Sequence, residues 1–241
     1  MPDLPGQSPT ARVVDLSQPL SEATVLWPGS TPFSGRTTNT VDSDGFFART
    51  IETPEHAATH IDAPAHFDPG GSTVDQIPAE RLVVPGVMLD ISDRCAADPD
   101  FAVTASDVER FERAEGPVAP GSAVLLRTGW DAHREDPARY LGGTDAENLH
   151  FPGYAESAAR LLIERGVVGI GIDTLSVDPG CETDLPVHEL TLSAGLWHLE
   201  CLIDLGRLPS RGFTLFAGAL ALAGGSGAPA RVVASVSFGG G

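Results

Sequence analysis

Four potential metal-binding side chains occur within eleven residues of this chain, and their spacing restricts the local fold more than any other feature. They stand in the stretch His56-Ala-Ala-Thr-His60-Ile-Asp62-Ala-Pro-Ala-His66. Imidazole nitrogen and carboxylate oxygen suit zinc and other first-row divalent ions. We therefore predict a metal site here. The alternative is a surface loop that carries three polar rings without a cation.

The spacing of these residues predicts how the backbone must run. Four residues of extended chain span about 13 Å, whereas ligands lie about 2.0 to 2.2 Å from their ion. His56 and His60 can therefore share one ion only if residues 57–59 form a turn. Asp62 follows His60 by two residues, so an extended segment points both to one side. The same extended chain would place His66 too far away to bind that ion, so we predict a catalytic acid or base.

A second candidate segment runs from Pro186 to Cys201 and contains His188, His198 and Glu200. In one straight helix, His188 and Glu200 would lie about 18 Å apart. A short helix that ends at Gly195, followed by a strand over 196–201, would bring them together. His198 would then share a face with Glu200 and be a rival ligand. An ordinary surface role for His188 and Glu200 remains an alternative.

Composition excludes several classes of partner. The net charge of −18 disfavours binding to nucleic acid or to anionic lipid, since both need clustered basic residues. No apolar run is long enough to span a bilayer, and the N-terminus has no signal-peptide pattern. The three cysteines show no CxxC spacing, so they indicate neither a thiolate zinc site nor a disulfide framework. We expect a cytoplasmic protein that acts on a small molecule.

The order of predicted elements indicates a mixed α/β fold. Residues 1–10 resemble a flexible arm, and we predict one domain over 11–241, because no internal repeat or linker interrupts it. Strand-like stretches alternate with two helix-like ones, the first capped by Thr104 and the second ended by Gly166. We expect strands at 11–15, 46–52 (half-buried), 122–128, 167–173 and 230–236, a strand, turn and strand over 81–91, and helices at 104–113 and 154–165.

The histidine stretch resembles the H-x-G-T-H-x-D-A-P-x-H-F motif of the cyclase family of metal-dependent hydrolases, which includes bacterial kynurenine formamidases and isatin hydrolases. The chain departs from this motif at Ala58, which replaces a glycine and tolerates positive φ less well. The resemblance continues through Trp27-Pro28-Gly29, Thr128-Gly129-Trp130, Phe151-Pro152-Gly153, Gly171–Pro179 and Gly227–Arg231.

This resemblance implies roles and a fold. It implies a single α/β domain with a β-barrel-like core and surrounding helices, of the swivelling β/β/α type, assembled as a homodimer or homotetramer. It implies a catalytic role for His66. The metal ligands that it implies are His56, His60, Asp62, His188 and Glu200.

The resulting hypothesis is a metal-dependent amidohydrolase with one or two divalent ions, for which imidazole content favours zinc and manganese is acceptable. A metal-bound hydroxide would attack a small aromatic amide, such as an N-formylkynurenine-like arylformamide, or a cyclic amide or lactone, with His66 as general acid and base. Trp27, Phe46 and Phe47 are candidates for an apolar substrate-binding wall, although core packing is an equal alternative. Two alternatives are a metal-dependent cyclase or lyase of secondary metabolism and a non-catalytic protein with a structural metal.

Overall fold

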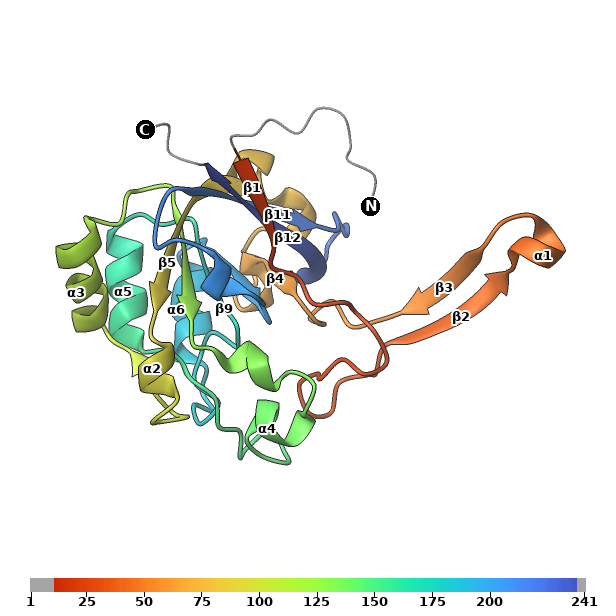
Figure 1. Ribbon diagram of the computed structural model, residues 1–241, viewed down its shortest axis with the longest axis horizontal. Helices are drawn as coiled ribbons and strands as arrows, with labels where there is room; N and C mark the ends of the chain where they lie inside the picture. Colours follow the sequence, from red (N-terminus) through yellow and green to blue (C-terminus); the bar gives the residue numbers. More distant parts are fainter. Residues whose placement is uncertain (1–10, 238–241) are drawn as a thin grey trace.

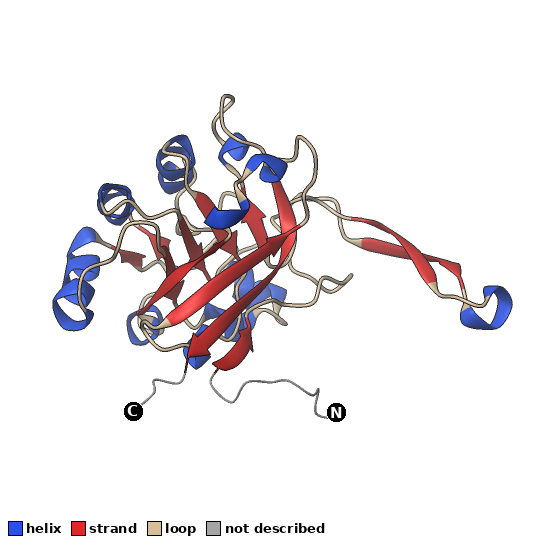
Figure 2. Cartoon of the chain, turned by 90° about the horizontal axis from the view of Figure 1, so that it is seen from above, coloured by secondary structure: helices blue, strands red, loops and turns tan. Residues whose placement is uncertain are grey.

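A computed structural model describes residues 11–237, and its centre is a mixed sheet that closes on itself (Figures 1 and 2). The strand order is β1-β12-β11-β5-β7-β9-β10-β4, and β4 pairs again with β12. Seven strands therefore form a closed barrel, and β1 extends it alongside β12. The strands are β1 (Ala11–Asp15), β4 (His60–Asp62), β5 (Val83–Asp90), β7 (Ala123–Arg127), β9 (Gly169–Ile172), β10 (Trp197–Glu200), β11 (Phe213–Ala219) and β12 (Gly227–Ser237).

Helices connect the parallel half of the barrel. Strands β5, β7, β9 and β10 are parallel neighbours, and parallel neighbours need crossover connections. The longer helices among these connections are α3 (Ala105–Glu115), α5 (Glu156–Glu164) and α6 (Pro186–Ser193). This arrangement confirms the predicted mixed α/β fold with a barrel core and surrounding helices. No helix within residues 11–237 combines the length and apolar character needed to cross a membrane.

The remaining elements are short. The additional strands form two small ladders, β2 (Ser34–Asn39) with β3 (Ala48–Glu52) and β6 (Ala102–Val103) with β8 (Gly153–Tyr154). Short α-helical turns are α1 (Val41–Asp44), α2 (Ser92–Cys95) and α4 (Pro137–Leu141). The 3-10 turns are η1 (Pro64–His66), η2 (Val74–Gln76), η3 (Ala79–Arg81), η4 (Trp130–His133) and η5 (Leu205–Arg207). The predicted arm over residues 1–10 lies outside the described residues.

Local sequence explains where the helices begin and end. The backbone N–H and the hydroxyl of Thr104 both donate to Asp107, at 2.9 and 2.7 Å, and so cap α3 as the sequence predicted. Gly166 follows α5 with φ +71°, a conformation that glycine adopts without steric cost. The predicted segment over 81–91 is different, because β5 continues through Pro85 and Gly86 without a turn. Gly86 has no side chain, which lets the ring of Phe213 lie directly against the strand.

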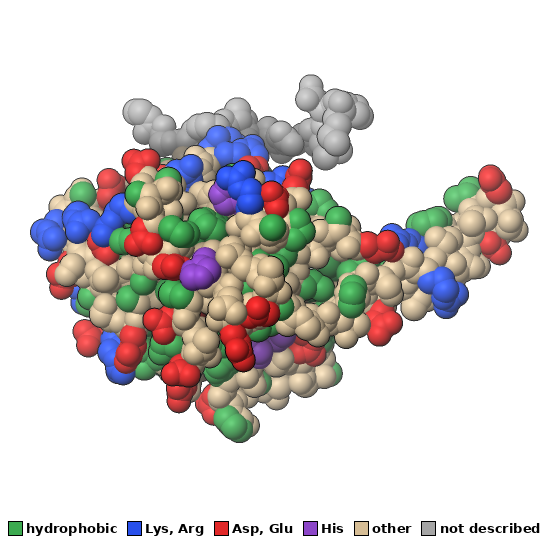
Figure 3. All heavy atoms as spheres, turned by 90° about the horizontal axis from the view of Figure 1, so that it is seen from below, with side chains coloured by type: hydrophobic (Ala, Val, Ile, Leu, Met, Phe, Trp, Pro, Cys, Tyr) green, Lys and Arg blue, Asp and Glu red, His purple; other side chains and the backbone are tan. Residues whose placement is uncertain are grey.

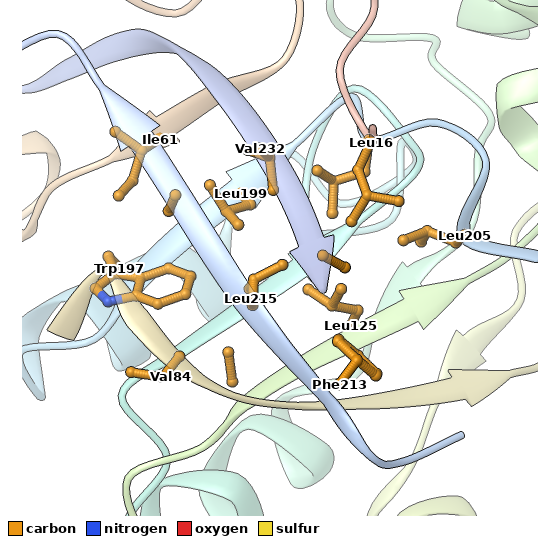
Figure 4. Packing of buried hydrophobic residues seen from close by; sticks show 14 of the residues in the cluster. Leu16, Ile61, Val84, Leu125, Trp197, Leu199, Leu205, Phe213, Leu215 and Val232 are labelled. Atoms are coloured by element: carbon orange, nitrogen blue, oxygen red, sulfur yellow. The ribbon is translucent and has the colours of Figure 1, made fainter. Parts of the chain in front are cut away.

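The barrel interior is filled mainly by aliphatic side chains, together with Trp197 and Phe213 (Figure 4). Leu125, Trp197, Leu199 and Leu215 are at most 1 % exposed. Side chains alternate along a strand, so Ile61 and Leu199 enter this core while their neighbours in β4 and β10 point to the opposite face. That opposite face carries the candidate metal ligands.

A long hairpin projects from the body of the molecule (Figure 1). It consists of β2, α1 and β3, and its strands pair with each other rather than with the barrel. The sequence predicted a half-buried strand over 46–52. The predicted burial is wrong. Phe46 and Phe47 are 55 % and 60 % exposed, and β3 begins only at Ala48. We call residues 34–52 the arm from here on; the name does not refer to residues 1–10.

We predict that Gly169→Ala will destabilise the fold by about 1–3 kcal/mol. A Cβ atom at this position would lie 2.3 Å from the ring of Trp197, which is buried inside the barrel and cannot move freely. Urea unfolding with an unchanged m-value would measure the effect. Gly70→Ala is the control, since its Cβ would meet only Asp68 at 3.5 Å. Equal stability of the two variants would contradict this account of the core.

Candidate metal centre

The register of two short strands places four polar side chains on one face. In the antiparallel ladder of β4 and β10, His198 lies opposite Asp62, and Glu200 lies opposite His60. Directly opposed residues on one face have Cβ atoms about 4.5–5.5 Å apart. All four residues are at most 4 % exposed. The ladder therefore brings together residues that are far apart in the sequence.

The predicted turn between His56 and His60 is present. Ala58 adopts φ +55°, in the left-handed region, which costs an L-residue about 1–2 kcal/mol. Thr59 donates its hydroxyl hydrogen to the carbonyl of Cys201 at 2.7 Å. This bond ties the turn to the end of β10. The turn also directs the carbonyl of Ala58 at the His60 ring.

Helix α6 supplies His188, as the sequence suggested. The helix ends at Ser193, Gly195 follows with φ +81°, and β10 then runs back along the barrel. The buried carboxylate of Asp178 accepts hydrogen bonds from the backbone N–H of Val187 at 2.8 Å and of His188 at 3.0 Å. It also accepts from His188 Nδ1 at 2.7 Å. Asp178 thus fixes both the start of the helix and the orientation of its imidazole.

The structure brings all five predicted metal ligands together around the carboxylate of Asp62. Its Oδ1 lies 2.6 Å from His56 Nδ1 and 3.2 Å from His60 Nε2, and its Oδ2 lies 3.4 Å from His188 Nε2. Glu200 faces His60 and His188 across the cluster, at 3.3 Å from each. The cluster therefore consists of carboxylate oxygens and imidazole nitrogens only.

Hydrogen bonds to the outside determine which ring nitrogen carries the hydrogen. His60 Nδ1 lies 2.9 Å from the carbonyl of Ala58, and His188 Nδ1 lies 2.7 Å from Asp178. Carbonyl and carboxylate oxygens only accept hydrogen bonds, so Nδ1 is the donor in both rings. In the neutral rings, the Nε2 atoms that face the cluster therefore carry lone pairs.

The same reasoning applies to His56. The Ser226 hydroxyl donates to Glu55 at 2.8 Å and so accepts from His56 Nε2 at 2.9 Å. Neutral His56 consequently presents a bare Nδ1 to Asp62. A contact between two acceptors is stable only with a proton or a cation between them. Hydrogen-bond acceptors of this kind, on the outer side of the ring, orient histidine ligands in metal sites.

The charges of the cluster favour binding of a cation. Burial opposes a charge on His60 and His188, but carboxylates outweigh it and hold the pKa of both imidazoles well above its usual range: chiefly Asp62 for His60, and Asp178 followed by Asp62 and Glu200 for His188. Burial would also raise the pKa of Asp62, but the surrounding histidines hold it well below its usual range. The pKa of His198 is lowered, because burial dominates there. A divalent cation would supply the positive charge that the carboxylates otherwise draw from protons.

Two buried atoms without a hydrogen-bond partner support the fit of a cation. Asp62 Oδ2 and His198 Nδ1 are buried and have no hydrogen-bond partner among the described residues. Both belong to a group of four residues, completed by His188 and Glu200, whose potential ligand atoms lie within 4.8 Å of one another. The donor set of nitrogen and oxygen suits zinc or manganese.

His66 lies nearer to the ligands than an extended chain would allow. Residues Pro64–His66 form the 3-10 turn η1, which folds the imidazole back so that it stacks on His56 with ring centroids 4.0 Å apart. His66 keeps solvent exposure where it lines a cavity, yet crowding by protein atoms, together with the nearby His56 and His188, lowers the pKa of His66 to about 4. His66 is therefore neutral at pH 7 and able to accept a proton.

A cavity of about 320 Å³ opens onto this cluster. His56, His60, His66, His188 and Glu200 form its polar end. Its apolar wall consists of Val25, Leu26, Trp27, Phe67, Leu175 and Leu185.

The structure places only one of the three predicted substrate-binding aromatics at this cavity. Trp27 lines it, as the sequence suggested. Phe46 and Phe47 do not line the cavity of their own chain, because the arm carries them outward into solvent. The hydrophobic pattern of 46–52 indicates an apolar contact, but it cannot distinguish a pocket wall from an exposed arm.

Sequence reasoning did not identify the outer partners of the ligands. Asp178 lies in Gly171–Pro179, one of the segments that resemble the cyclase family. The resemblance therefore indicated this segment but not the role of Asp178. Ser226 and Glu55 gave no signal, since their contact joins positions 171 residues apart. His150 lies outside the cluster and pairs with Asp100 at the surface, at 2.9 Å.

Comparison with known proteins gives the family. Residues 14–179 match the Cyclase family model, described as "Putative cyclase". Isatin hydrolase of Roseibium aggregatum is 35 % identical over 205 residues, which cover 81 % of this chain and 78 % of that protein. Kynurenine formamidase of Bacillus cereus is 29 % identical over 225 residues, with 93 % and 97 % covered.

Solved structures agree in fold over nearly the whole chain. Isatin hydrolase A from Ralstonia solanacearum superposes with a TM-score of 0.89 at 34 % identity, and covers 94 % of this chain and 92 % of its own. An isatin hydrolase bound to the product analogue thioisatinate gives a TM-score of 0.89 at 30 % identity, with 95 % and 94 % covered. The chain belongs to the cyclase family of metal-dependent hydrolases.

Proposed function

We propose that this enzyme hydrolyses the carbon–nitrogen bond of a small aromatic amide or lactam. The observation that carries the proposal is the cavity. It has an apolar wall, and at its polar end lie the candidate metal ligands and the neutral imidazole of His66. A purely structural metal would need no such access from solvent. The similarity to isatin hydrolases and kynurenine formamidases supports the same reaction class.

The residues of the chain divide the work of this reaction. His56, His60, Asp62, His188 and Glu200 would hold divalent metal, which, when bound, lowers the pKa of a water and polarises the substrate carbonyl. Water adds to the carbonyl carbon, and the bond from that carbon to nitrogen breaks. His66 would accept a proton from the water and return it to the departing nitrogen. Trp27 would hold the aromatic ring against the wall of the cavity.

The cavity favours a neutral, compact substrate such as isatin. Among the described residues that line it, none is basic apart from the histidines, and the chain contains no lysine. The amino-acid carboxylate of N-formylkynurenine would therefore lack an arginine or lysine partner among the residues that line this cavity. N-formylkynurenine remains the second candidate, because kynurenine formamidases match over more of this chain than does the isatin hydrolase of Roseibium aggregatum.

Zinc is the metal that we propose, with manganese as the alternative. Four imidazoles stand near the two carboxylates, and imidazole-rich sites suit zinc. The two oxygens of Asp62 face different histidines, so the cluster offers room for one or two ions.

We also propose that the enzyme is a homodimer or homotetramer assembled through the arm. Val41, Phe46, Phe47 and Ile51 each expose more than half of their surface on this projecting hairpin. Figure 3 shows hydrophobic side chains beside charged ones along it. Exposed apolar groups gathered on one element commonly mark a protein interface.

Metal removal should abolish turnover and lower thermal stability. The cluster would lose the cation that compensates its buried carboxylates, and a ligand at 100 times its Kd contributes about 2.7 kcal/mol to folding. Dialysis against a chelator, followed by a melting scan and an assay before and after zinc or manganese is restored, measures both effects. Because protons compete for the same nitrogens, metal affinity should rise with pH. Full activity in metal-free protein would contradict the mechanism.

A substrate panel tests the reaction itself. We expect metal-loaded enzyme to open the ring of isatin with a higher kcat/KM than it shows for N-formylkynurenine, since the cavity offers no cation for a carboxylate. Dienelactone-type compounds complete the panel. If every compound fails although metal is bound, the proposed hydrolysis is wrong, and a cyclase or lyase reaction becomes the better explanation.

Replacement of His66 separates proton transfer from metal binding in the same assay. His66→Ala should lower kcat by about 10²–10⁴-fold, while the metal content of the protein stays unchanged. His133→Ala is the matched control, because this histidine lies in η4 and belongs neither to the cluster nor to the cavity lining, and it should leave both quantities unaltered. Full turnover by the His66 variant would exclude the catalytic role given to this residue.

Two substitutions on the arm test the proposed assembly. Phe46→Ser combined with Phe47→Ser should shift the protein from a dimer or tetramer toward the monomer in light scattering after size-exclusion chromatography, because it removes the exposed apolar contact. Leu220→Ser with Leu222→Ser is the control, since these residues are exposed at another part of the surface. An unchanged mass for the arm variant would show that the arm does not hold the assembly.

A further inference from the structure

His198 is the buried histidine of the cluster to which the proposed mechanism gives no role. It is 0 % exposed and lies in β10, opposite Asp62 in the ladder with β4. The cavity touches His60, His188 and Glu200 but not His198. His198 can therefore affect the site only through buried neighbours and not through contact with a substrate in the cavity.

Hydrogen bonds determine its tautomer. The hydroxyl oxygen of Thr191 lies 2.6 Å from the carbonyl oxygen of Val187 and 2.6 Å from His198 Nε2. A carbonyl has no hydrogen to give, so the contact with Val187 must use the hydroxyl hydrogen. Nε2 of His198 then carries its own hydrogen and donates it to Thr191. In the neutral ring, Nδ1 keeps a free lone pair.

That lone pair faces another acceptor. Nδ1 of His198 lies 3.4 Å from Oδ2 of Asp62, and neither atom has a partner among the described residues. The same Oδ2 lies 3.4 Å from His188 Nε2, which is also bare because its ring donates to Asp178 through Nδ1. Buried acceptors that converge in this way lose free energy unless a positive species lies between them.

We propose that His198 is a metal ligand, and that with Asp62 Oδ2, His188 Nε2 and Glu200 Oε1 it completes an inner four-ligand site. The separations from Asp62 to the two histidines are 3.4 Å, and that from His188 to Glu200 is 3.3 Å. Two ligands that lie about 2.1 Å from one tetrahedral ion stand roughly 3.4 Å apart. These three separations match the spacing that one ion requires, and the potential ligand atoms of all four residues lie within 4.8 Å of one another.

This assignment gives the two halves of the cluster different roles. The outer half has His56, His60 and Oδ1 of Asp62, and it lies beside His66 at the cavity. Four protein ligands are typical of structural zinc sites, whereas three leave a position for water or substrate. The inner ion therefore holds Asp62 and Glu200 in place, and the outer position serves the reaction. The inference rests on the metal dependence of the proposed function but not on its substrate.

Metal titration of metal-free protein tests the proposal with zinc or cobalt alone. Wild-type protein should bind two ions per chain. His198→Gln keeps an amide that can donate to Thr191 but withdraws the ligand atom from Asp62, so it should weaken one of the two ions by more than roughly 100-fold, beyond the loss typical of an outer partner. His198→Asn places an amide oxygen near the position of Nδ1 and should restore part of that affinity.

The matched control is His150→Gln, a surface histidine that pairs with Asp100 and should leave both ions bound. Circular dichroism confirms that each variant is folded. If His198→Gln does not fold, the test rests on the number of ions bound by wild-type protein and on the metal affinity of His198→Asn. The proposal is overturned if wild-type protein saturates with one ion, or if a folded His198 variant without the ligand atom keeps two ions of unchanged affinity. Ion counts do not depend on substrate, so a failed substrate panel would not affect them.

Discussion

The buried carboxylate of Asp62 is the group on which the rest of the site depends. It is 1 % exposed, with one oxygen facing His56 and His60 and the other facing His188 and His198. A buried charge is costly unless it is compensated. Because the ring hydrogens of these histidines point outward to other acceptors, a cation is the compensating partner that the arrangement fits. The metal is therefore part of the stability of this region as well as its chemistry.

The barrel explains how such a crowded centre can be held in place. Ile61 and Leu199 fill the barrel interior, and their neighbours on the opposite face of β4 and β10 form the site. The same two strands thus supply both packing and ligands, so a shift of one residue in their register would exchange them. Sites supported by rigid strands keep a more exact geometry than sites on loops.

Much of this could be predicted from the sequence, and the limit has a physical cause. The spacing of His56 and His60, if both bind one ion, required a turn over 57–59, and the predicted helix, Gly195 and returning strand correctly brought His188 toward Glu200. These inferences depend on backbone reach, which is local. The outer partners depend on tertiary contacts between distant segments, which spacing does not encode. The aromatic pair on the arm shows the same limit, because an apolar pattern does not tell whether the side chains line a pocket or stand exposed on a projecting hairpin.

The proposed mechanism divides the histidines into those that would bind metal and one, His66, that would move protons. Four imidazoles each donate a hydrogen bond to an outer acceptor, which fixes the nitrogen that faces the cluster. The ring of His66 makes no side-chain hydrogen bond within residues 11–237; it stacks on His56 and borders the cavity. A metal ligand benefits from a fixed tautomer, whereas a proton carrier must exchange its hydrogen. The absence of an outer acceptor is therefore the structural property that suits His66 to general acid and base catalysis.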